Sequence, residues 1–154
     1  MLRPVQATDV AVFFEQQSDP DAAHMAAFTV NDPGDPDLFA QQWRTIFVND
    51  AITSFTVQHQ GAVAGYVLAY PWAGTLEVSY WLGRRFWGQG IATEALLQLL
   101  TVVVARPLTA HVAHDNVGSL RALEKCGFAV MASGSAYSSV RRCDVDEFVL
   151  GLGV

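Results

Sequence analysis

Between residues 80 and 92 the chain passes from an apolar, aromatic run through three glycines into an apolar helical pattern, and this transition constrains the fold most. Gly83, Gly88 and Gly90 separate a run that reads as a strand from a run that reads as a helix. Backbone N–H groups at the start of a helix attract anions, and glycines let an anion approach the main chain without a Cβ in the way. The segment therefore predicts a phosphate-binding turn within an α/β sheet.

Two common nucleotide-binding patterns do not fit this turn. A P-loop starting at residue 83 would need Lys and then Ser or Thr where the chain has Gln89 and Gly90. A dinucleotide-binding fingerprint starting at Gly88 would need a glycine where Thr93 stands. The pattern that remains is Arg85-x-x-Gly88-x-Gly90.

The rest of the chain reads as strands and helices in alternation. Apolar spacing, capping residues and turn residues set the expected bounds. Thr8 is expected to cap the first helix, Asp35 with Pro36 to open the second, and segment 18–34 to be irregular. The expected elements are strands over residues 2–5, 53–59, 63–70, 75–82, 108–113, 128–132 and 143–150, and helices over residues 9–17, 36–48, 88–105 and 117–126.

This order predicts one α/β domain over residues 1–154, with a mixed sheet and a right-handed crossover at its central β-α-β step. The helix over 88–105 is apolar almost all round, so we expect it to be buried against the sheet. The expected inner face of the helix over 117–126 consists of Val117, Leu120, Leu123 and Cys126.

Composition excludes several classes of function. The net charge is -6 and the longest basic clusters are two arginine pairs, so no basic surface is available for nucleic acid. Apolar stretches are too short to span a bilayer and the N-terminus has no apolar signal core, which predicts a cytoplasmic protein without a membrane partner. Cys126 and Cys143 match no metal-ligand spacing, so we expect no metal and two buried or half-buried thiols.

The acidic charge is concentrated in the first 50 residues, which contain eight acidic and two basic side chains. An acidic face close to a binding site would attract cationic small molecules. A solvated acidic surface that only aids solubility is the alternative.

The pattern Arg85-x-x-Gly88-x-Gly90 resembles the pyrophosphate-binding signature of the GNAT acyltransferase superfamily, Gln/Arg-x-x-Gly-x-Gly/Ala. In that family the signature lies between the fourth strand and the next helix. The resemblance extends over about residues 53–132 and is strongest to the ribosomal-protein alanine/serine N-acetyltransferase (Rim-type) branch. The other matching motifs are Glu77-x-x-Tyr80-Trp81-Leu82-Gly83 before the turn and Asn116-x-x-Ser119 with Glu124-Lys125-x-Gly127-Phe128 after it.

The resemblance implies a mostly antiparallel mixed sheet with splayed central strands and helices on both faces. Acetyl-CoA would be the co-substrate, with its pantetheine arm along the backbone of Tyr80, Trp81 and Leu82. Asn116 would hydrogen-bond this arm, although capping the following helix is an equally open role. The residues implied around the pyrophosphate are Arg85, Gly88, Gln89, Gly90, Ile91 and Ala92.

The resemblance also implies catalytic roles. Glu77 stands where many family members keep a glutamate that accepts the proton of the attacking amine. Leu123 replaces the tyrosine that usually protonates the departing thiolate, so Ser119 is the candidate donor. Tyr80 and Tyr137 are the alternative donors. His111 and His114 lie beside the implied site, where packing or capping is the more common role of a histidine.

The acceptor would be a primary amine, either a peptide N-terminus or a small cationic molecule. Neither cysteine lies where a ping-pong nucleophile is expected, which favours direct attack in a ternary complex. The alternative is a CoA-binding sensor or interaction module without turnover. Small acyltransferases often dimerise, so a homodimer is also compatible with the resemblance. The side chains that could line the binding site of the acceptor amine are those of His24, Met25, Phe28 and Trp43.

Overall fold

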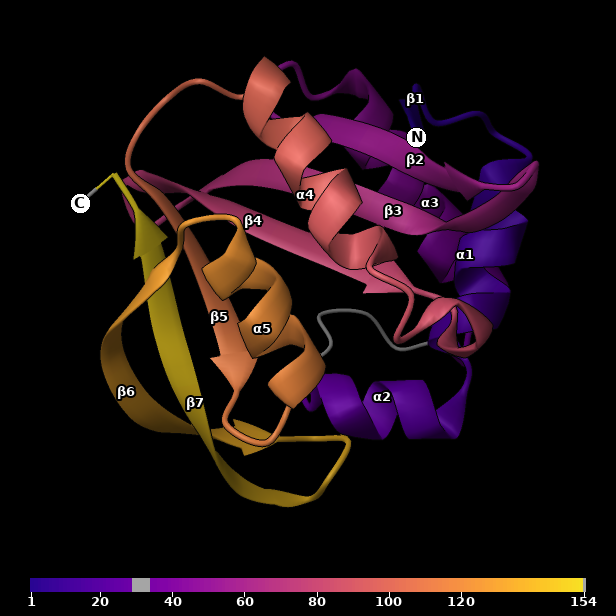
Figure 1. Ribbon diagram of the computed structural model, residues 1–154. Coiled ribbons are helices and arrows are strands. Elements are labelled where there is room, and N and C mark those ends of the chain that lie inside the picture. Colours follow the sequence, from indigo (N-terminus) through magenta and orange to yellow (C-terminus); the bar gives the residue numbers. More distant parts are fainter. Residues whose placement is uncertain (29–33, 154) are drawn as a thin grey trace.

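In the computed structural model, which describes residues 1–28 and 34–153, the described strands form one seven-stranded sheet with helices on both faces (Figure 1). The elements are, in chain order, β1 (Leu2–Arg3), α1 (Asp9–Gln17), α2 (Pro20–Ala26), α3 (Pro36–Val48), β2 (Thr53–His59), β3 (Ala62–Trp72), β4 (Thr75–Leu82), the 3-10 helix η1 (Arg84–Phe86), α4 (Ile91–Val102), β5 (Leu108–Ala113), α5 (Val117–Lys125), β6 (Ala129–Ser138) and β7 (Cys143–Leu152).

The strand order is β1-β2-β3-β4-β5-β7-β6, and every neighbouring pair is antiparallel except β4 and β5. These two parallel strands pair at two positions, Leu76 with Leu108 and Glu77 with Thr109. Beyond Glu77, β4 continues to pair with β3, and β5 continues to pair with β7. The two central strands therefore diverge after their first residues, as expected.

Each face of the sheet has its own apolar core. Leu96 and Leu99 of α4 and Leu123 of α5 are fully buried against one face. On the other face, Phe13 of α1 and Trp43 of α3 pack around Tyr66 of β3, with ring centroids 5.0–5.1 Å apart. Figure 1 shows α4 and α5 in front of the sheet, with α1 and α3 on the opposite side. The mixed, mostly antiparallel fold with helices on both faces is thus confirmed.

The prediction that segment 18–34 is irregular was wrong, because α2 occupies Pro20–Ala26. Asp19 accepts a hydrogen bond from the N–H of Asp21 at 3.1 Å, and Pro20 starts the helix. This is the same Asp-Pro opening that correctly predicted α3 at Asp35. Residues 29–33 lie outside the described part of the chain.

The start of α1 is as predicted, but Thr8 makes no capping hydrogen bond. Instead, the buried carboxylate of Asp9 accepts two hydrogen bonds from Arg3, at 2.7 and 2.8 Å, and one from the hydroxyl of Thr56 at 2.7 Å. These bonds join α1 to β1 and β2. The pKa of Asp9 is lowered to about 2, and the largest cause is its hydrogen bonding to Arg3.

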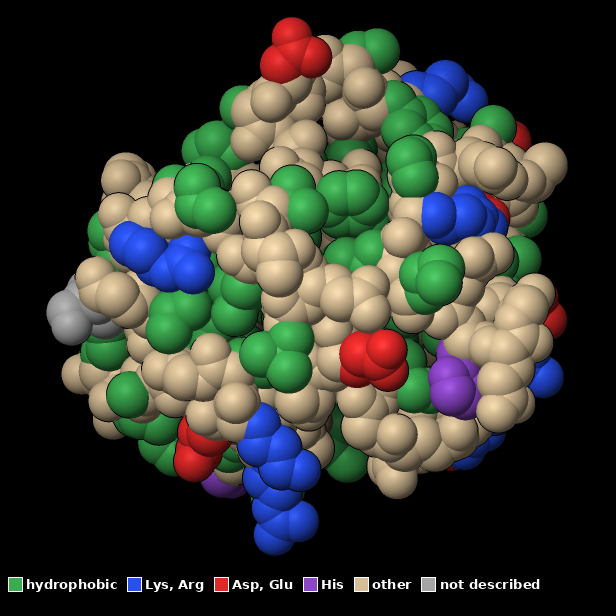
Figure 2. Space-filling view, turned by 45° about the horizontal axis from the view of Figure 1, so that its top comes forward, with side chains coloured by type: hydrophobic (Ala, Val, Ile, Leu, Met, Phe, Trp, Pro, Cys, Tyr) green, Lys and Arg blue, Asp and Glu red, His purple; other side chains and the backbone are tan. Residues whose placement is uncertain are grey.

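Helix α4 is shorter and less buried than its sequence suggests. It begins at Ile91, after Gly90 in a left-handed conformation, and its side chains at Leu97 and Val102 are 49% and 56% exposed. Figure 2 shows hydrophobic side chains spread over the face on which α4 lies. The apolar pattern overstated burial because only one side of this helix meets the sheet.

Two further expectations of burial were wrong. Val117 is 49% exposed because it starts α5 beside the open cavity described below. Cys126 is buried as expected, whereas Cys143 is exposed at the start of β7. Within residues 1–28 and 34–153, no helix combines the length and apolar character needed to cross a bilayer.

Candidate active site

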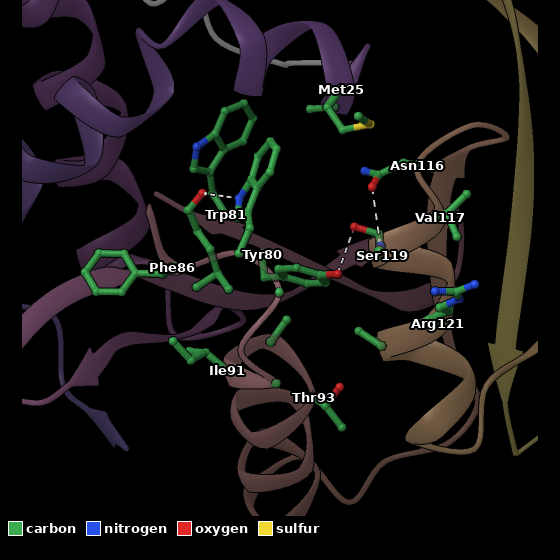
Figure 3. A pocket seen from close by; sticks show the side chains of 18 of the residues that line it. Met25, Tyr80, Trp81, Phe86, Ile91, Thr93, Asn116, Val117, Ser119 and Arg121 are labelled. Atoms are coloured by element: carbon green, nitrogen blue, oxygen red, sulfur yellow. Dashed lines mark hydrogen bonds between the residues drawn. The ribbon is translucent and has the colours of Figure 1, made fainter. Parts of the chain in front are cut away.

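A cavity of about 550 Å³ opens where β4 and β5 diverge (Figure 3). Its walls come from the end of β4, the turn before α4, the starts of α4 and α5, and one side of α2. These elements are far apart in sequence and meet because the two strands separate. The cavity is lined by Ala22, Met25, Ala26, Tyr80, Trp81, Leu82, Phe86, Trp87, Gly88, Gly90, Ile91, Ala92, Thr93, Asp115, Asn116, Val117, Gly118, Ser119, Arg121, Ala122 and Lys125.

The β4 wall provides an unpaired strand edge. Tyr80, Trp81 and Leu82 line the cavity and have no partner residue on β5. The indole Nε1 of Trp87 donates to the carbonyl of Leu82 at 3.1 Å, which fixes the strand end against the turn. The backbone groups of this edge that face the cavity can pair with an amide-bearing ligand as a neighbouring strand would.

The turn after β4 has the backbone geometry of an anion cradle. Gly88 and Gly90 have φ values of 72° and 76°, in the left-handed region that favours glycine. A Cβ added at either glycine would meet no atom within 4 Å, so the space beside the main chain is open. Helix α4 begins immediately afterwards at Ile91, and its N–H groups add positive potential to the turn.

Helix α5 presents polar groups to the cavity from its first turn. Asn116 caps the helix by accepting from the N–H of Ser119 at 3.3 Å, so the expected capping role is observed, and Asn116 also lines the cavity. The hydroxyl of Tyr80 donates to Oγ of Ser119 at 2.8 Å, which Figure 3 shows spanning the cavity. Burial raises the pKa of Tyr80 to about 12, so this hydroxyl keeps its proton at neutral pH.

Two basic residues that the sequence reasoning missed also line the cavity, Arg121 and Lys125 of α5. The available signal was their spacing, since residues four apart share a helix face with Val117. Val117 was expected on the inner face with Leu120, Leu123 and Cys126, but it lies on the face of Arg121 and Lys125, whereas Leu123 and Cys126 are buried as expected. Because Leu123 is fully buried, the position of the usual tyrosine faces the core in this protein.

Glu77 lies on the opposite face of the sheet from Tyr80. Successive side chains of a strand alternate between the two faces, and these two residues are three positions apart on β4. Its carboxylate is 5% exposed and accepts from the hydroxyl of Thr109 at Oε2, at 2.7 Å. Oε1 is 2.7 Å from Nδ1 of His111. Tyr70 faces the same group from β3, where burial and then the charge of Glu77 raise the pKa of this tyrosine. A carboxylate–histidine pair therefore stands at the point where the strands separate.

Helix α2 closes one side of the cavity and is held at both ends by arginines. Arg84 of η1 forms ion pairs with Asp19, at 2.9 Å, and with Asp21. At the other end, Arg141 donates to the carbonyl of His24 at 2.8 Å and makes a two-point ion pair with Asp115 at 2.7 and 2.9 Å. These contacts place Met25 in the cavity wall.

Contacts of this kind neutralise or occupy several carboxylates of the acidic N-terminal segment. Asp9, Asp19 and Asp21 are each paired with an arginine, and Asp35 caps α3. Half of the eight acidic residues in this segment therefore have structural partners, and the segment is a weaker cation attractor than its composition implies.

The structure brings most of the predicted site residues together, but not all. Nine of them line the cavity: Tyr80, Trp81, Leu82, Gly88, Gly90, Ile91, Ala92, Asn116 and Ser119. Arg85 stacks on Phe86, with its guanidinium carbon 4.5 Å from the ring centroid, and Gln89 donates to the carbonyl of Arg85 at 2.9 Å. None of Arg85, Gln89 and Glu77 is a cavity-lining residue, and Glu77 lies further back along β4, on the face that it shares with Trp81.

Other candidates lie elsewhere. Trp43 is in the core, and His24 is exposed and contributes its carbonyl to Arg141. His114 is exposed, with Nδ1 3.1 Å from the carbonyl of Asp146 in β7, and Tyr137 is 64% exposed on β6. The described residues 1–28 and 34–153 contain no cluster of three His, Cys, Asp or Glu side chains that could hold a metal ion.

The fold and the cavity define a class of protein that holds a phosphate-bearing, amide-containing ligand along a splayed strand edge. Residues 1–129 match the family model of the acetyltransferase (GNAT) domain, and the chain therefore belongs to this family. The predicted family is confirmed, and with it acetyl-CoA as the acetyl donor. A search of curated proteins gives no significant match to the sequence.

Solved structures confirm the fold at low sequence identity. Spermidine N-acetyltransferase from Vibrio cholerae, in complex with CoA and spermine, is 15% identical, with a TM-score of 0.83 over 99% of this chain and 94% of that chain. A putative acetyltransferase from Salmonella typhimurium with acetyl-CoA is 19% identical, with a TM-score of 0.83 over 99% and 92%. Ribosomal-protein-alanine N-acetyltransferase from Brucella melitensis is 17% identical, with a TM-score of 0.83 over 99% and 98%.

Proposed function

We propose that this protein transfers the acetyl group of acetyl-CoA to a primary amine by direct attack within a ternary complex. The observation that carries the proposal is the break in β4–β5 pairing after Glu77 and Thr109, with the glycine turn at its mouth. The break leaves an unpaired strand edge for the amides of pantetheine, and the turn offers main-chain N–H groups for the pyrophosphate. Both features face one cavity.

The charges around the cavity support CoA as the ligand. CoA carries a pyrophosphate and a further phosphate on its ribose. Arg121 and Lys125 line the cavity, and the positive end of α4 faces it from the glycine turn. We assign these groups, with main-chain amides of Gly88, Gly90 and Ile91, to the phosphates.

The two faces of the sheet divide the reaction between them. Tyr80 and Ser119 lie on the face that α4 and α5 cover, where the sulfur of CoA would leave. Glu77 lies on the other face, from which an amine would approach the thioester between the strands. An amine and a thioester held on opposite sides of one opening can react without a covalent enzyme intermediate.

We assign Ser119 to the departing thiolate. Because the hydroxyl of Tyr80 donates to Oγ of Ser119, the proton of Ser119 remains free to form a hydrogen bond to the departing sulfur. Ser119 is also in the first turn of α5, whose positive end stabilises a negative sulfur. The pair Tyr80–Ser119 would then replace the tyrosine that the family usually has at the position of Leu123.

The acceptor is a peptide N-terminus or a small cationic amine. Spermine is bound in the Vibrio cholerae enzyme, and a ribosomal-protein alanine is the acceptor named for the Brucella melitensis enzyme. Both acceptors are primary amines, which supports the chemical class. We further propose that the protein acts in the cytoplasm, without nucleic acid or a membrane as partner.

The test is release of free CoA thiol from acetyl-CoA by the purified protein in the presence of one amine at a time. The panel consists of peptides with N-terminal Ala or Ser, spermidine, an aminoglycoside and free amino acids. We expect turnover with one class. If no amine in the panel gives thiol release while CoA still raises Tm, the alternative of a CoA-binding module without turnover is favoured instead.

A further inference from the structure

Glu77 is held in a way that keeps it from meeting the amine directly. The carboxylate is 5% exposed, and both of its oxygens are occupied, Oε2 by the hydroxyl of Thr109 and Oε1 by Nδ1 of His111. A proton acceptor must come within about 3 Å of the proton it removes, or within reach through one water. The buried carboxylate therefore needs an intermediary.

His111 has the geometry of that intermediary. An ionised carboxylate only accepts hydrogen bonds, so the 2.7 Å contact with Glu77 requires the proton of a neutral His111 to be on Nδ1. Nε2 then carries the lone pair and lies on the side of the ring away from the carboxylate. The His111 side chain is 37% exposed, whereas that of Glu77 is 5% exposed, so the imidazole can be reached from solvent more easily than the carboxylate.

The pair stands at the opening between the strands. Glu77 and Thr109 are the last paired residues of β4 and β5, and His111 lies two residues further along β5, on the same face as Thr109. This is the face that the proposed function assigns to the amine. Tyr80 and Ser119 are on the other face, beside the sulfur.

We infer that Nε2 of His111 takes the proton of the attacking amine, and that Glu77 is a positioning residue that orients the imidazole and stabilises its charged form. This inference rests on the proposed function. The neutral amine attacks the thioester carbon and the C–N bond forms. The nitrogen proton passes to Nε2, giving an imidazolium, and the C–S bond breaks with its electron pair on sulfur. The imidazolium then returns its proton to solvent through its exposed edge.

Few other titratable groups face the pair in the described part of the chain. Tyr70 approaches Glu77 from β3, and Glu147 of β7 lies on the same sheet face, one position diagonal to His111. From the segment after α2, Ala27 and Phe28 add apolar contacts next to Ala113. Of the two carboxylates, the buried one of Glu77 is in direct contact with the imidazole.

The decisive variant is His111→Asn. The amide nitrogen of asparagine takes the place of Nδ1 and keeps a donor for Glu77, but the group at Nε2 is lost. His111→Ala provides a second variant, since added imidazole can enter the space of the missing ring. His114→Ala is the matched control, because His114 is an exposed histidine that contacts the carbonyl of Asp146. Each variant is assayed with acetyl-CoA and either an alanyl peptide or spermidine.

We expect both His111 variants to lower kcat about 100-fold with little change in KM for acetyl-CoA. The acidic limb of the pH–rate profile, in the range where imidazoles titrate, should disappear, and imidazole should restore part of the rate of His111→Ala. Glu77→Gln should lower the rate less, because Nε2 of the imidazole remains while the charged partner that orients the ring is gone. His114→Ala should behave as the wild type.

Several outcomes would overturn the inference without touching the proposed function. In each, the wild type acetylates the amine, but His111→Asn keeps the wild-type rate, or the acidic limb survives in both His111 variants, or imidazole restores nothing to His111→Ala. A wild type that binds CoA and acetylates no amine in the panel would overturn both. Measuring Tm and CoA affinity for each variant separates loss of the proton acceptor from loss of the fold.

Discussion

Substitution of Gly90 by alanine separates the strain of a left-handed backbone from the loss of a phosphate site. Gly90 has a φ of 76°, and its missing Cβ would point into open space beside the cavity. A non-glycine residue in this conformation costs about 1–2 kcal/mol. For a chain of this size that corresponds to a fall in Tm of roughly 2–4 °C per kcal/mol.

Gly61 is a matched control for Gly90→Ala. It has a φ of 78°, also has no atom within 4 Å of an added Cβ, and lies in the turn between β2 and β3, away from the residues that line the cavity. Gly61→Ala should therefore lower Tm by a similar amount. The two variants differ only in what approaches the turn from solvent.

CoA affinity distinguishes the two variants. If the pyrophosphate binds at Gly90, the added methyl group displaces it from at least one main-chain N–H. A hydrogen bond to a charged group is worth about 1.5–3 kcal/mol, which corresponds to roughly 10- to 100-fold in Kd. Titration calorimetry with CoA should show this loss for Gly90→Ala and an unchanged Kd for Gly61→Ala. Equal affinities in the two variants would refute the assignment of this turn to the phosphates.

Three further perturbations test other parts of the structure. Asp9→Asn should lower the free energy of unfolding at pH 7 by about 2 kcal/mol, because the pKa of Asp9 is lowered to about 2 in the fold. In the wild type this contribution is complete above about pH 5 and is lost as the pH falls toward 2. Urea unfolding at several pH values checks it, and parallel curves for variant and wild type would contradict it. Ser119→Ala should lower kcat roughly tenfold, less than a general acid usually contributes, since a thiol titrates at roughly 8.5 and its thiolate leaves readily without prior protonation. Ser119→Thr, which keeps the hydroxyl, should retain most of the rate, and equal rates for both variants would argue against proton donation. Arg121→Gln combined with Lys125→Gln should raise KM for acetyl-CoA roughly tenfold at low salt and by less at high salt. A KM that does not change would place the phosphates elsewhere.

Local signals predicted most of the elements correctly. The turn at Gln60-Gly61 gave the hairpin of β2 and β3, and Asp35 with Pro36 gave the start of α3. The same Asp-Pro signal at Asp19 and Pro20 marks the start of α2, the helix absent from the sequence-based prediction. Burial was predicted less well, because periodicity shows which residues share a face but not which face meets a neighbour. Leu97 and Val117 are exposed for this reason.

The candidate site was predicted in part. The glycine turn, Asn116 and Ser119 could be found from the sequence because each belongs to a local motif. Arg121 and Lys125 looked like ordinary surface residues until α5 was placed against the diverging strands. The side chains of Arg85 and Gln89 contact Phe86 and the turn itself, because side-chain direction depends on the final path of the loop. The role expected of their main-chain N–H groups at the phosphates stays a prediction.

The sequence by itself determined the order of the strands and of helices α1, α3, α4 and α5, the place of the glycine turn and the family to which the chain belongs, since each depends on residues close together in the chain. Only the tertiary structure decided what Glu77 contacts. Its contacts with Thr109 and His111 join residues more than thirty positions apart, and they exist because β4 and β5 pair at this point and then separate. Long-range strand pairing creates both the opening and the buried carboxylate at its edge, and no local pattern specifies either.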